Sequence, residues 1–379
     1  MSRLVSLYVA AFAMLSLMAG CAGRVENQEP PTPPEPVTEV SFAIGADVSW
    51  ASEMENDGIV FADQAGRTGI YPVLRGAGVN SIRLRVWVNP YDEKLWSGTV
   101  DVVKRAREAY EAGFAVMIDF HYSDIFADPG RQTCPRDWAS YSDDVPKVAS
   151  AVASHTKSVL TALKMTGVTP AWVQVGNETN NGMVWPAGKI DWNKSGSARY
   201  ANYVKVSNAG YDAVKEVFPD TPVIVHIADA YSAGEYDCWF FREFKEAGGK
   251  FDIIGLSHYP MSKGDNSHVQ QNKLAVESIK ALAAKFSCKV MVCEVGIKPS
   301  ASEGANCIKS FMSSVRNLGD KVCAGVFYWE PEVDGKWKPA IYSVPGLVCD
   351  GWSAYDMGAF YSDGAIFSPI STIMSNFAH

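Results

Sequence analysis

The sequence predicts a single (β/α)8 barrel, the TIM-barrel fold, with enlarged loops after its strands. Short apolar runs alternate with amphipathic helical stretches from about residue 41 to the end of the 379-residue chain. The runs are nearly continuous in apolar residues, as parallel strands covered on both faces should be. Almost every run ends in polar residues, and the carboxyl ends of the strands are where such barrels carry catalytic groups.

The expected strands, each a short apolar run, cover residues 42–50, 79–88, 114–123, 171–175, 222–228, 253–259, 289–294 and 325–329. The expected helices cover residues 100–112, 144–165, 196–217, 238–247, 270–286, 304–318 and 368–377. In the first of them, Val102, Ala106 and Tyr110 recur at helical spacing, and Gly113 ends it. A doubly wound open sheet is the alternative, which is disfavoured because no Gly-x-Gly-x-x-Gly turn follows the first strand.

The composition is that of an ordinary globular protein and argues against two classes of partner. Hydrophobic residues make up 47% of the chain and charged residues 20%, which excludes a disordered protein. The formal net charge is −8 and no basic stripe occurs, so nucleic acid and anionic membrane surfaces are poor candidate partners. The eleven Trp fit both a large core and a groove in which sugar rings stack.

The N-terminal 40 residues are expected to lie outside the fold. Arg3 precedes an apolar run from Leu4 to Met18, so residues 1–20 are typical of a signal peptide. Small residues directly before Cys21 resemble the bacterial lipobox, in which the Cys becomes the lipidated first residue. Ordinary secretion with an unrelated Cys is the alternative. Residues 21–40 are rich in Pro and Glu and predict an extended tether, so the catalytic barrel covers residues 41–379.

Two carboxylates suggest the chemistry. Glu178 follows the fourth expected strand in the order Val-Gly-Asn-Glu178, and Glu294 ends the seventh. Retaining glycoside hydrolysis uses such a pair, roughly 5–5.5 Å apart: one protonates the leaving oxygen and the other attacks the anomeric carbon. Each residue alone has an ordinary structural explanation, such as a charge at a helix N-terminus. The hypothesis depends on Glu178 and Glu294 occurring together with many other polar residues at the ends of the expected strands. These residues include Asp47, Arg83, Asp124, His226, Asp229 and Glu330.

A metal-dependent barrel hydrolase is the second chemical hypothesis, because His121, His226 and His258 fall on the third, fifth and sixth strands. It is disfavoured because no His-x-His pair ends the first strand and no His-Glu-x-x-His helix occurs. Apart from Cys21 there is an odd number of Cys, and none shows Cys-x-x-Cys spacing. We therefore expect no metal and no cofactor.

Several motifs spread along the barrel form a specific set. They are Gly45-Ala-Asp-Val-Ser49, Arg83-Leu-Arg-Val-Trp-Val-Asn-Pro90, Asp119-Phe-His-Tyr-Ser-Asp124 with Ala127-Asp-Pro129, Val175-Gly-Asn-Glu178 with Trp185-Pro186, Ser257-His-Tyr-Pro260 and Phe327-Tyr-Trp-Glu-Pro331. Together they resemble the family 53 endo-β-1,4-galactanases, which belong to clan A of the glycoside hydrolases. The resemblance implies a retaining hydrolase that cuts within β-1,4-galactan, the side chain of pectic arabinogalactan, to galacto-oligosaccharides.

The resemblance also implies roles for individual residues. Glu178 would be the general acid/base and Glu294 the nucleophile, which Arg85 would hold ionised. Asn177 would bond the sugar 2-hydroxyl, where contacts strengthen in the transition state. The other expected substrate-site residues, which orient a carboxyl group or contact the sugars, are Trp87, Asp119, His121, His258, Tyr259 and Trp329.

The chain departs from the family pattern after the seventh strand. Some bacterial members carry an Asp- and Gly-rich calcium loop there, whereas residues 296–304 contain a single carboxylate. Calcium takes six or more oxygen ligands, so we expect none at this loop. Two other functions stay open: a surface lipoprotein that binds glycan without cutting it, and a clan A hydrolase of mannan or β-glucan.

The expected partners follow from these interpretations. They are β-1,4-galactan and, through lipidated Cys21, the outer membrane, with the protein itself a monomer. Glu26 and Glu29, soon after Cys21, suggest display at the cell surface.

Overall fold

The computed structural model describes residues 40–378 except 231–234, 261–266, 299–302, 334–336, 345–346, 348–356, 364–365 and 369–375. The expected signal peptide, the lipidation site at Cys21 and the tether up to residue 39 lie outside this part of the chain. So does the middle of the loop at which calcium is not expected.

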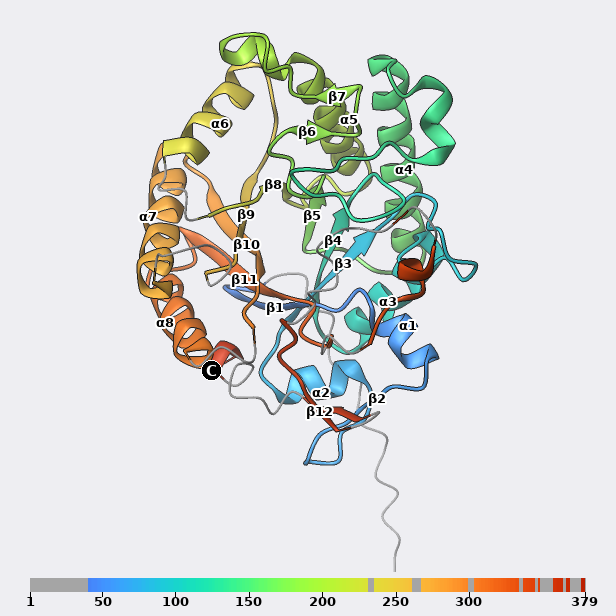
Figure 1. Cartoon of the computed structure of the whole chain (residues 1–379), viewed down its shortest axis with the longest axis vertical. Helices are drawn as coiled ribbons and strands as arrows, with labels where there is room; N and C mark the ends of the chain where they lie inside the picture. The colour runs from blue at the N-terminus through green and yellow to red at the C-terminus, as the bar shows by residue number, and fades with distance from the viewer. Residues whose placement is uncertain are drawn as a thin grey trace, which may run out of the picture. The chain divides into compact units, whose positions relative to one another are not determined.

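Eight parallel strands form a closed barrel (Figure 1). They are β1 (Ala43–Asp47), β3 (Ser81–Val86), β4 (Ala115–Phe120), β5 (Trp172–Val175), β8 (Val223–Ile227), β9 (Ile253–His258), β10 (Lys289–Val295) and β11 (Cys323–Trp329). Each strand pairs with the next in this order, and β11 pairs with β1 to close the ring. The predicted fold and all eight expected strands are confirmed.

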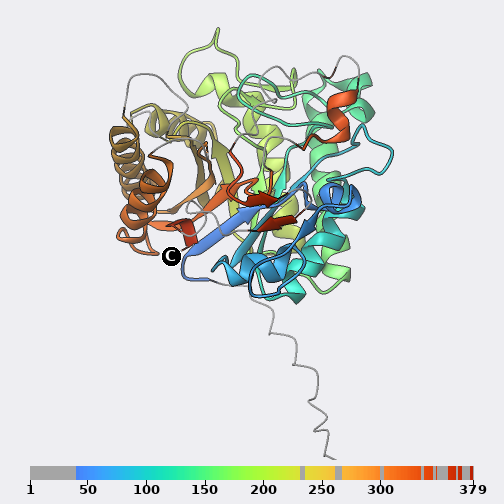
Figure 2. The same cartoon turned by 60° about the horizontal axis from the view of Figure 1, so that its bottom comes forward.

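Helices follow most of the strands and cover the outside of the barrel. They are α3 (Thr99–Glu111), α4 (Val145–Met165), α5 (Ala201–Val217) with the preceding 3-10 helix η2 (Gly196–Tyr200), α6 (Glu235–Glu246), α7 (His268–Phe286) and α8 (Gly304–Arg316). Figure 2 shows α7 and α8, in tan to orange, on one side of the strands and α3 and α4, in cyan to green, on the other. These six helices were expected from the sequence.

Several short elements were not expected. They are the helices α1 (Ala51–Asn56) and α2 (Ile70–Gly76), the 3-10 helices η1 (Arg136–Tyr141) and η3 (Ala340–Ser343), and the hairpin of β6 (Gly182–Met183) and β7 (Gly188–Lys189).

The expected last helix is wrong at its start. Ser368 ends β13 (Ile366–Ser368), which pairs with β12 (Tyr361–Asp363) and with β2 (Val60–Phe61). The pairing with β2 joins segments some 300 residues apart, and local sequence patterns carry no information on such a contact. Residues 369–375 lie outside the described chain.

Two layers of side chains fill the barrel. The lower interior is apolar and buried, and consists of Ala43, Ala115, Met117, Ala171, Trp172, Ile224, Ile253, Met291, Cys293, Ala324 and Phe327. Above this plug, toward the carboxyl ends of the strands, the inward positions are polar. Arg83, Asp119 and Gln174 are each at most 1% exposed there. Buried polar groups need partners, so this upper layer has to be a hydrogen-bonded network.

A β-bulge in β10 turns Glu294 toward the interior. Val292 pairs with Leu256 and Glu294 pairs with Ser257, so Cys293 is an extra residue in the strand. Cys293 already belongs to the interior plug, and strict alternation would send the next side chain outward. The bulge shifts the alternation by one residue, and Glu294 therefore shares the interior with Ser257.

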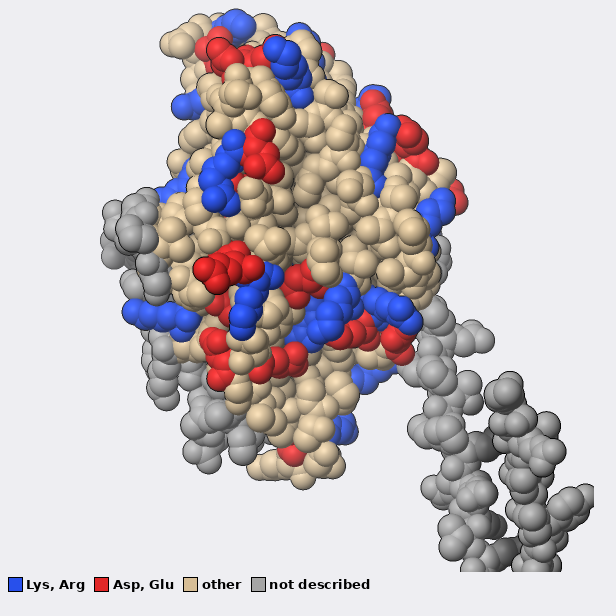
Figure 3. Space-filling model, turned by 90° about the vertical axis from the view of Figure 1, so that its right-hand side faces the viewer, with Lys and Arg blue, Asp and Glu red and all other residues tan. Residues whose placement is uncertain are grey.

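The surface carries charges of both signs. On the face shown in Figure 3, Lys and Arg side chains lie beside Asp and Glu side chains and form no large basic patch. Exposed ion pairs are common, for example Arg107 Nε with Glu111 Oε1 at 2.7 Å. Over the described ranges, no helix combines the length and the apolar character needed to cross a membrane.

Candidate active site

A cavity of about 280 Å³ opens at the carboxyl ends of the strands. It is lined by residues that follow or end β4, β5, β9, β10 and β11, namely His121, Phe126, Ala127, Asp128, Asn177, Glu178, Tyr259, Glu294 and Trp329, together with Met357. The structure therefore brings Glu178 and Glu294, 116 residues apart in sequence, around one space.

Glu294 is held by a cation and a hydroxyl group. Arg83 Nη2 lies 3.0 Å from Oε1, and the Tyr259 hydroxyl donates to Oε2 at 2.7 Å. Burial raises the pKa of Glu294, and the Arg83 guanidinium and the Tyr259 hydroxyl oppose that rise. Both contacts favour the carboxylate form, which is the form a nucleophile needs.

Arg83 is the centre of the buried network. Its Nη1 lies 2.7 Å from Asp47 Oδ2 and its Nη2 lies 2.7 Å from Asp119 Oδ2. Burial disfavours the charge of Asp119, but Arg83 and His121 outweigh it and hold the pKa of Asp119 below its usual value. One guanidinium thus faces three carboxylates, because its planar fork has enough donors to serve several acceptors.

Arg85 does not contact Glu294, and the expectation that it would is wrong. Its Nη1 pairs with Glu330 Oε1 at 2.6 Å, and its guanidinium carbon lies 3.8 Å from the centre of the Trp50 ring. Arg83 is the residue in register with Asp47 on β1, whereas Arg85 lies two residues nearer the end of β3. Both point to one face of the strand, so only the register separates their partners.

Three other expected substrate-site residues do not reach the cavity. Trp87 is 1% exposed and packs edge-on against Trp50. His258 is fully buried; its Nε2 lies 2.8 Å from Asn272 Oδ1 of α7, and burial lowers its pKa to about 4. Asp119 is fully buried and acts on the site through Arg83. The cavity lining does include Asn177, His121, Tyr259 and Trp329.

Glu178 is presented by a strained turn after β5. Gly176 has a φ of 83° and Glu178 a φ of 45°, in the left-handed region. A Cβ atom on Gly176 would lie 2.6 Å from Thr179 Cγ2, so the turn requires glycine. Glu178 itself is half-buried, and Ser257 Oγ donates to its Oε1 at 2.6 Å.

The electrostatics of the two carboxyl groups differ. Burial and the nearby charge of Glu294 raise the pKa of Glu178 well above its ordinary value. Among the described residues no Lys or Arg pairs with Glu178, whereas Arg83 pairs with Glu294. Two interacting acids share protons, and the one without a cation retains its proton to higher pH. Glu178 is therefore the protonated partner and Glu294 the charged one.

Asn177 is fixed by the same network. Its Oδ1 accepts from Arg83 Nη2 at 2.9 Å and from Gln174 Nε2 at 3.0 Å, while its Nδ2 donates to Ala127 O at 2.8 Å. An amide nitrogen has two hydrogens, and Asn177 lines the cavity. Its second N–H can therefore serve a ligand without any rearrangement.

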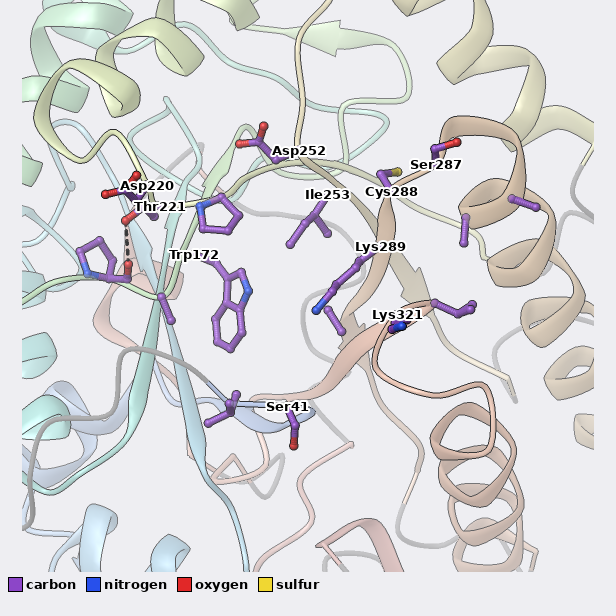
Figure 4. A pocket seen from close by; sticks show the side chains of 18 of the residues that line it. Ser41, Trp172, Asp220, Thr221, Asp252, Ile253, Ser287, Cys288, Lys289 and Lys321 are labelled. Atoms are coloured by element: carbon purple, nitrogen blue, oxygen red, sulfur yellow. Dashed lines mark hydrogen bonds between the residues drawn. The ribbon is translucent and has the colours of Figure 1, made fainter.

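A larger cavity of about 930 Å³ lies at the opposite, amino end of the strands. Figure 4 shows Trp172, Asp252, Lys289 and Lys321 around it. The Asp252 carboxylate has structural partners, since Oδ2 accepts from the Val223 N–H at 2.9 Å and pairs with Lys215 at 2.8 Å. The lining of this cavity also includes Asp220. The smaller cavity is the candidate site because it lies at the carboxyl ends of the strands and brings together Glu178 and Glu294.

Comparison with known proteins supports this interpretation. The sequence model of glycosyl hydrolase family 53 matches residues 43–306. The chain belongs to glycosyl hydrolase family 53. The match ends before β11, so Trp329 and Glu330 lie beyond the matched segment.

Relatives and solved structures agree with the family assignment. The endo-β-1,4-galactanase of Bacillus subtilis is 33% identical over 320 residues, covering 76% of this chain and 70% of the relative. A probable arabinogalactan endo-β-1,4-galactanase A of Aspergillus terreus is 31% identical over 316 residues, covering 76% and 84%. The family 53 catalytic domain of Ignisphaera aggregans has a TM-score of 0.72 at 26% identity, covering 91% of this chain and 97% of that one.

Sequence reasoning did not assign Phe126, Asp128 or Met357, which line the cavity of this family 53 site, and it missed two residues of the hydrogen-bonded network around it, Gln174 and Ser257. Gln174 Nε2 donates to Asp119 Oδ1 at 2.6 Å, and Ser257 joins Glu178 to His226 Nε2, which lies 2.9 Å from Ser257 Oγ. Gln174 had a signal: it is the one polar residue inside the apolar strand β5. Ser257 begins the motif Ser257-His-Tyr-Pro260, but nothing in the sequence shows that it faces Glu178.

Proposed function

We propose that this chain is a retaining endo-β-1,4-galactanase that cuts the galactan side chains of pectic arabinogalactan into galacto-oligosaccharides. The observation that carries the mechanism is the pair Glu178 and Glu294, which line one cavity. Arg83 lies beside Glu294, whereas the pKa of Glu178 is raised well above its ordinary value. The substrate is supported by the names of the family 53 relatives, which are galactanases.

In the first step, Glu294 attacks the anomeric carbon while Glu178 gives its proton to the departing glycosidic oxygen. The bond to the leaving sugar breaks and an ester forms between Glu294 and the galactosyl unit. Esterification removes the negative charge of Glu294, which is one cause of the raised pKa of Glu178. The pKa of Glu178 then falls, so that it can take a proton from water in the second step, and the ester is hydrolysed with retention.

The first prediction tests both roles. Glu294→Gln should abolish release of reducing ends from β-1,4-galactan, and Glu178→Ala should lower kcat by about 10²–10⁴-fold. On nitrophenyl β-1,4-galactobioside, whose leaving group needs no proton, azide should restore turnover to Glu178→Ala by attacking the ester on Glu294. It should not do so for Glu294→Gln, which has no nucleophile to form that ester. Glu93→Gln, at an exposed position, is the control and should match the wild type.

Two results would contradict the proposal. Galactan cleavage that survives both substitutions would exclude this carboxylate pair. Wild-type protein whose migration is slowed by galactan in affinity electrophoresis, but which releases no reducing ends, would favour the glycan-binding lipoprotein.

A panel with mannan and β-glucan separates a family 53 galactanase from another clan A hydrolase. EDTA should leave galactan release unchanged, because residues 296–304 hold only one carboxylate for calcium.

We also propose that the protein is a monomer, is exported and is anchored to the outer membrane by lipid on Cys21. The apolar run from Leu4 to Met18 and the small residues before Cys21 support export and the lipid anchor. The second prediction is that labelled palmitate is incorporated into the full chain and that Cys21→Ser protein leaves the membrane fraction. A Cys21→Ser variant that stays with the membrane would contradict lipid anchoring.

A further inference from the structure

An exposed tryptophan stands on the loop that carries the catalytic acid. Trp192 follows β7 and is 43% exposed, and it is the only exposed tryptophan in the part of the chain that the structure describes. Its ring stacks on that of Trp239 in α6, with centroids 6.0 Å apart and planes 21° apart. In Figure 1, β7 and α6 both lie in the upper part of the view.

The exposed ring is held in one orientation. Trp192 Nε1 donates to Asn181 Oδ1 at 3.0 Å. The Arg199 guanidinium lies 5.2 Å from the centre of the Trp192 ring and 4.9 Å from that of Trp239, and Arg199 Nε is 3.4 Å from Glu243. Ordering a large apolar side chain at the surface gains little for folding, since much of its area stays in water. A rigid aromatic face of this kind is typical of a binding surface.

Asn181 connects this surface to the cavity wall. It lies three residues after Glu178, so their Cα atoms are at most about 11 Å apart. The side chain that accepts from Trp192 also donates, through Nδ2, to Pro129 O at 2.8 Å. Pro129 adjoins Asp128, which lines the cavity. A single side chain, the amide of Asn181, therefore links Trp192 by hydrogen bonds to the segment that lines the cavity.

The position of Trp192 relative to Glu178 and Glu294 determines which part of a bound galactan chain would reach its ring. The acid that protonates the leaving oxygen stands on the side of the departing sugars, while the nucleophile stands beneath the sugar that it attacks. Trp192 and Asn181 share a loop with Glu178, not with Glu294. The loop therefore faces the leaving-group part of a bound chain, toward its reducing end.

We propose that Trp192, backed by Trp239, forms a binding subsite for a sugar on the leaving-group side of the cleavage point; this rests on the proposed function. A β-linked galactopyranose has a face of C–H groups that can lie on an indole ring and leave its hydroxyls in water. Trp192 would thus help to set which bond of the galactan is cut and how long the released reducing-end fragment is.

The test uses β-1,4-galactohexaose labelled at its reducing end and a short substrate, nitrophenyl β-1,4-galactobioside. Trp192→Ala should raise KM for the hexaose by about three- to tenfold. The labelled fragments should also become shorter, because the hexaose is no longer held in the positions that place a leaving-group sugar on Trp192. The loss of kcat/KM should be at least threefold smaller on the short substrate, whose leaving group is a single nitrophenol. Trp192→Phe keeps an aromatic face and should retain most of the wild-type fragment pattern.

Met165→Ala, which removes another exposed apolar side chain, at the end of α4, is the matched control and should keep the wild-type fragment pattern. An unchanged fragment pattern and KM in Trp192→Ala would overturn the subsite, and so would equal losses on both substrates, which indicate damage to the fold. Wild-type protein that cleaves no galactan contradicts the proposed function instead. The subsite is then judged by galactan affinity electrophoresis of Glu294→Gln with and without Trp192→Ala: equal retardation overturns it, and weaker retardation of the double variant supports it.

Discussion

At the scale of single residues, one guanidinium group makes two chemically identical side chains differ in their tendency to ionise. Glu178 and Glu294 line the same cavity and are both buried enough to have raised pKa values. Only Glu294 has Arg83 beside it, with Nη2 at 3.0 Å. The proposed roles of Glu178 as acid and Glu294 as nucleophile therefore depend on a residue that itself takes no part in bond making.

The third prediction concerns this residue. In Arg83→Lys, a single ammonium cannot serve Asp47, Asp119 and Glu294 together, so the pKa of Glu294 should rise. More Glu294 is then protonated at a given acidic pH, and the acidic limb of kcat/KM on galactan should move to higher pH. The maximum of kcat/KM should fall by roughly ten- to hundredfold. The pH profile measured on soluble galactan checks both effects.

Arg107→Lys makes the same change at an exposed ion pair with Glu111 and should leave the profile as in the wild type. An acidic limb that stays in place in Arg83→Lys, with only a uniform loss of rate, would contradict this role of Arg83.

At the scale of elements, two local departures from regular strand geometry create the site. The bulge at Cys293 turns Glu294 inward, and the left-handed turn at Gly176 carries Asn177 and Glu178 over the cavity. Both lie at the carboxyl ends of strands, where strain is tolerated because the apolar plug below holds the barrel together. The regular parts of these strands stabilise the barrel, and their irregular carboxyl ends place Glu178 and Glu294 at the cavity.

The fourth prediction tests the turn. Gly176→Ala places a Cβ at a φ of 83° and 2.6 Å from Thr179 Cγ2, whereas Gly167→Ala places one at a φ of 82° with no atom within 4 Å. Both should lower the free energy of unfolding by about 1 kcal/mol for the backbone strain. Gly176→Ala should lose a further 1–2 kcal/mol or so for the clash, and much of its kcat.

Urea denaturation and galactan hydrolysis of the two variants provide the measurement. Equal stability and equal activity of Gly176→Ala and Gly167→Ala would show that the turn does not position Glu178.

At the scale of the whole molecule, a group of buried acids links stability to pH. Glu330 and Glu332 are at most 1% exposed. Burial raises the pKa of Glu332 to about 8. The folded protein therefore keeps a proton on Glu332 that the unfolded chain releases above its ordinary pKa of 4.5. Stability contributed by this proton is lost as the pH rises from 4.5 to 8.

The fifth prediction follows from that sign. Glu332→Gln is neutral at every pH, so its melting temperature relative to the wild type should rise between pH 5 and pH 8. The gain in the free energy of unfolding is at most about 1.4 kcal/mol for each pH unit in this window. Scanning calorimetry at several pH values is the measurement, with exposed Glu93→Gln as the control. A difference between Glu332→Gln and wild type that is constant from pH 5 to pH 8 would contradict a protonated Glu332.

The sequence by itself determined the barrel, the six large helices after its strands, and the two acids at the ends of the fourth and seventh barrel strands. These follow from local periodicity and from residue types at strand ends, which need no knowledge of partners. Register and side-chain direction are set by contacts between segments far apart in the chain. Only the tertiary structure therefore showed that Arg83 rather than Arg85 holds Glu294, that Trp87 and His258 are buried away from the cavity, and that Ser257 faces Glu178.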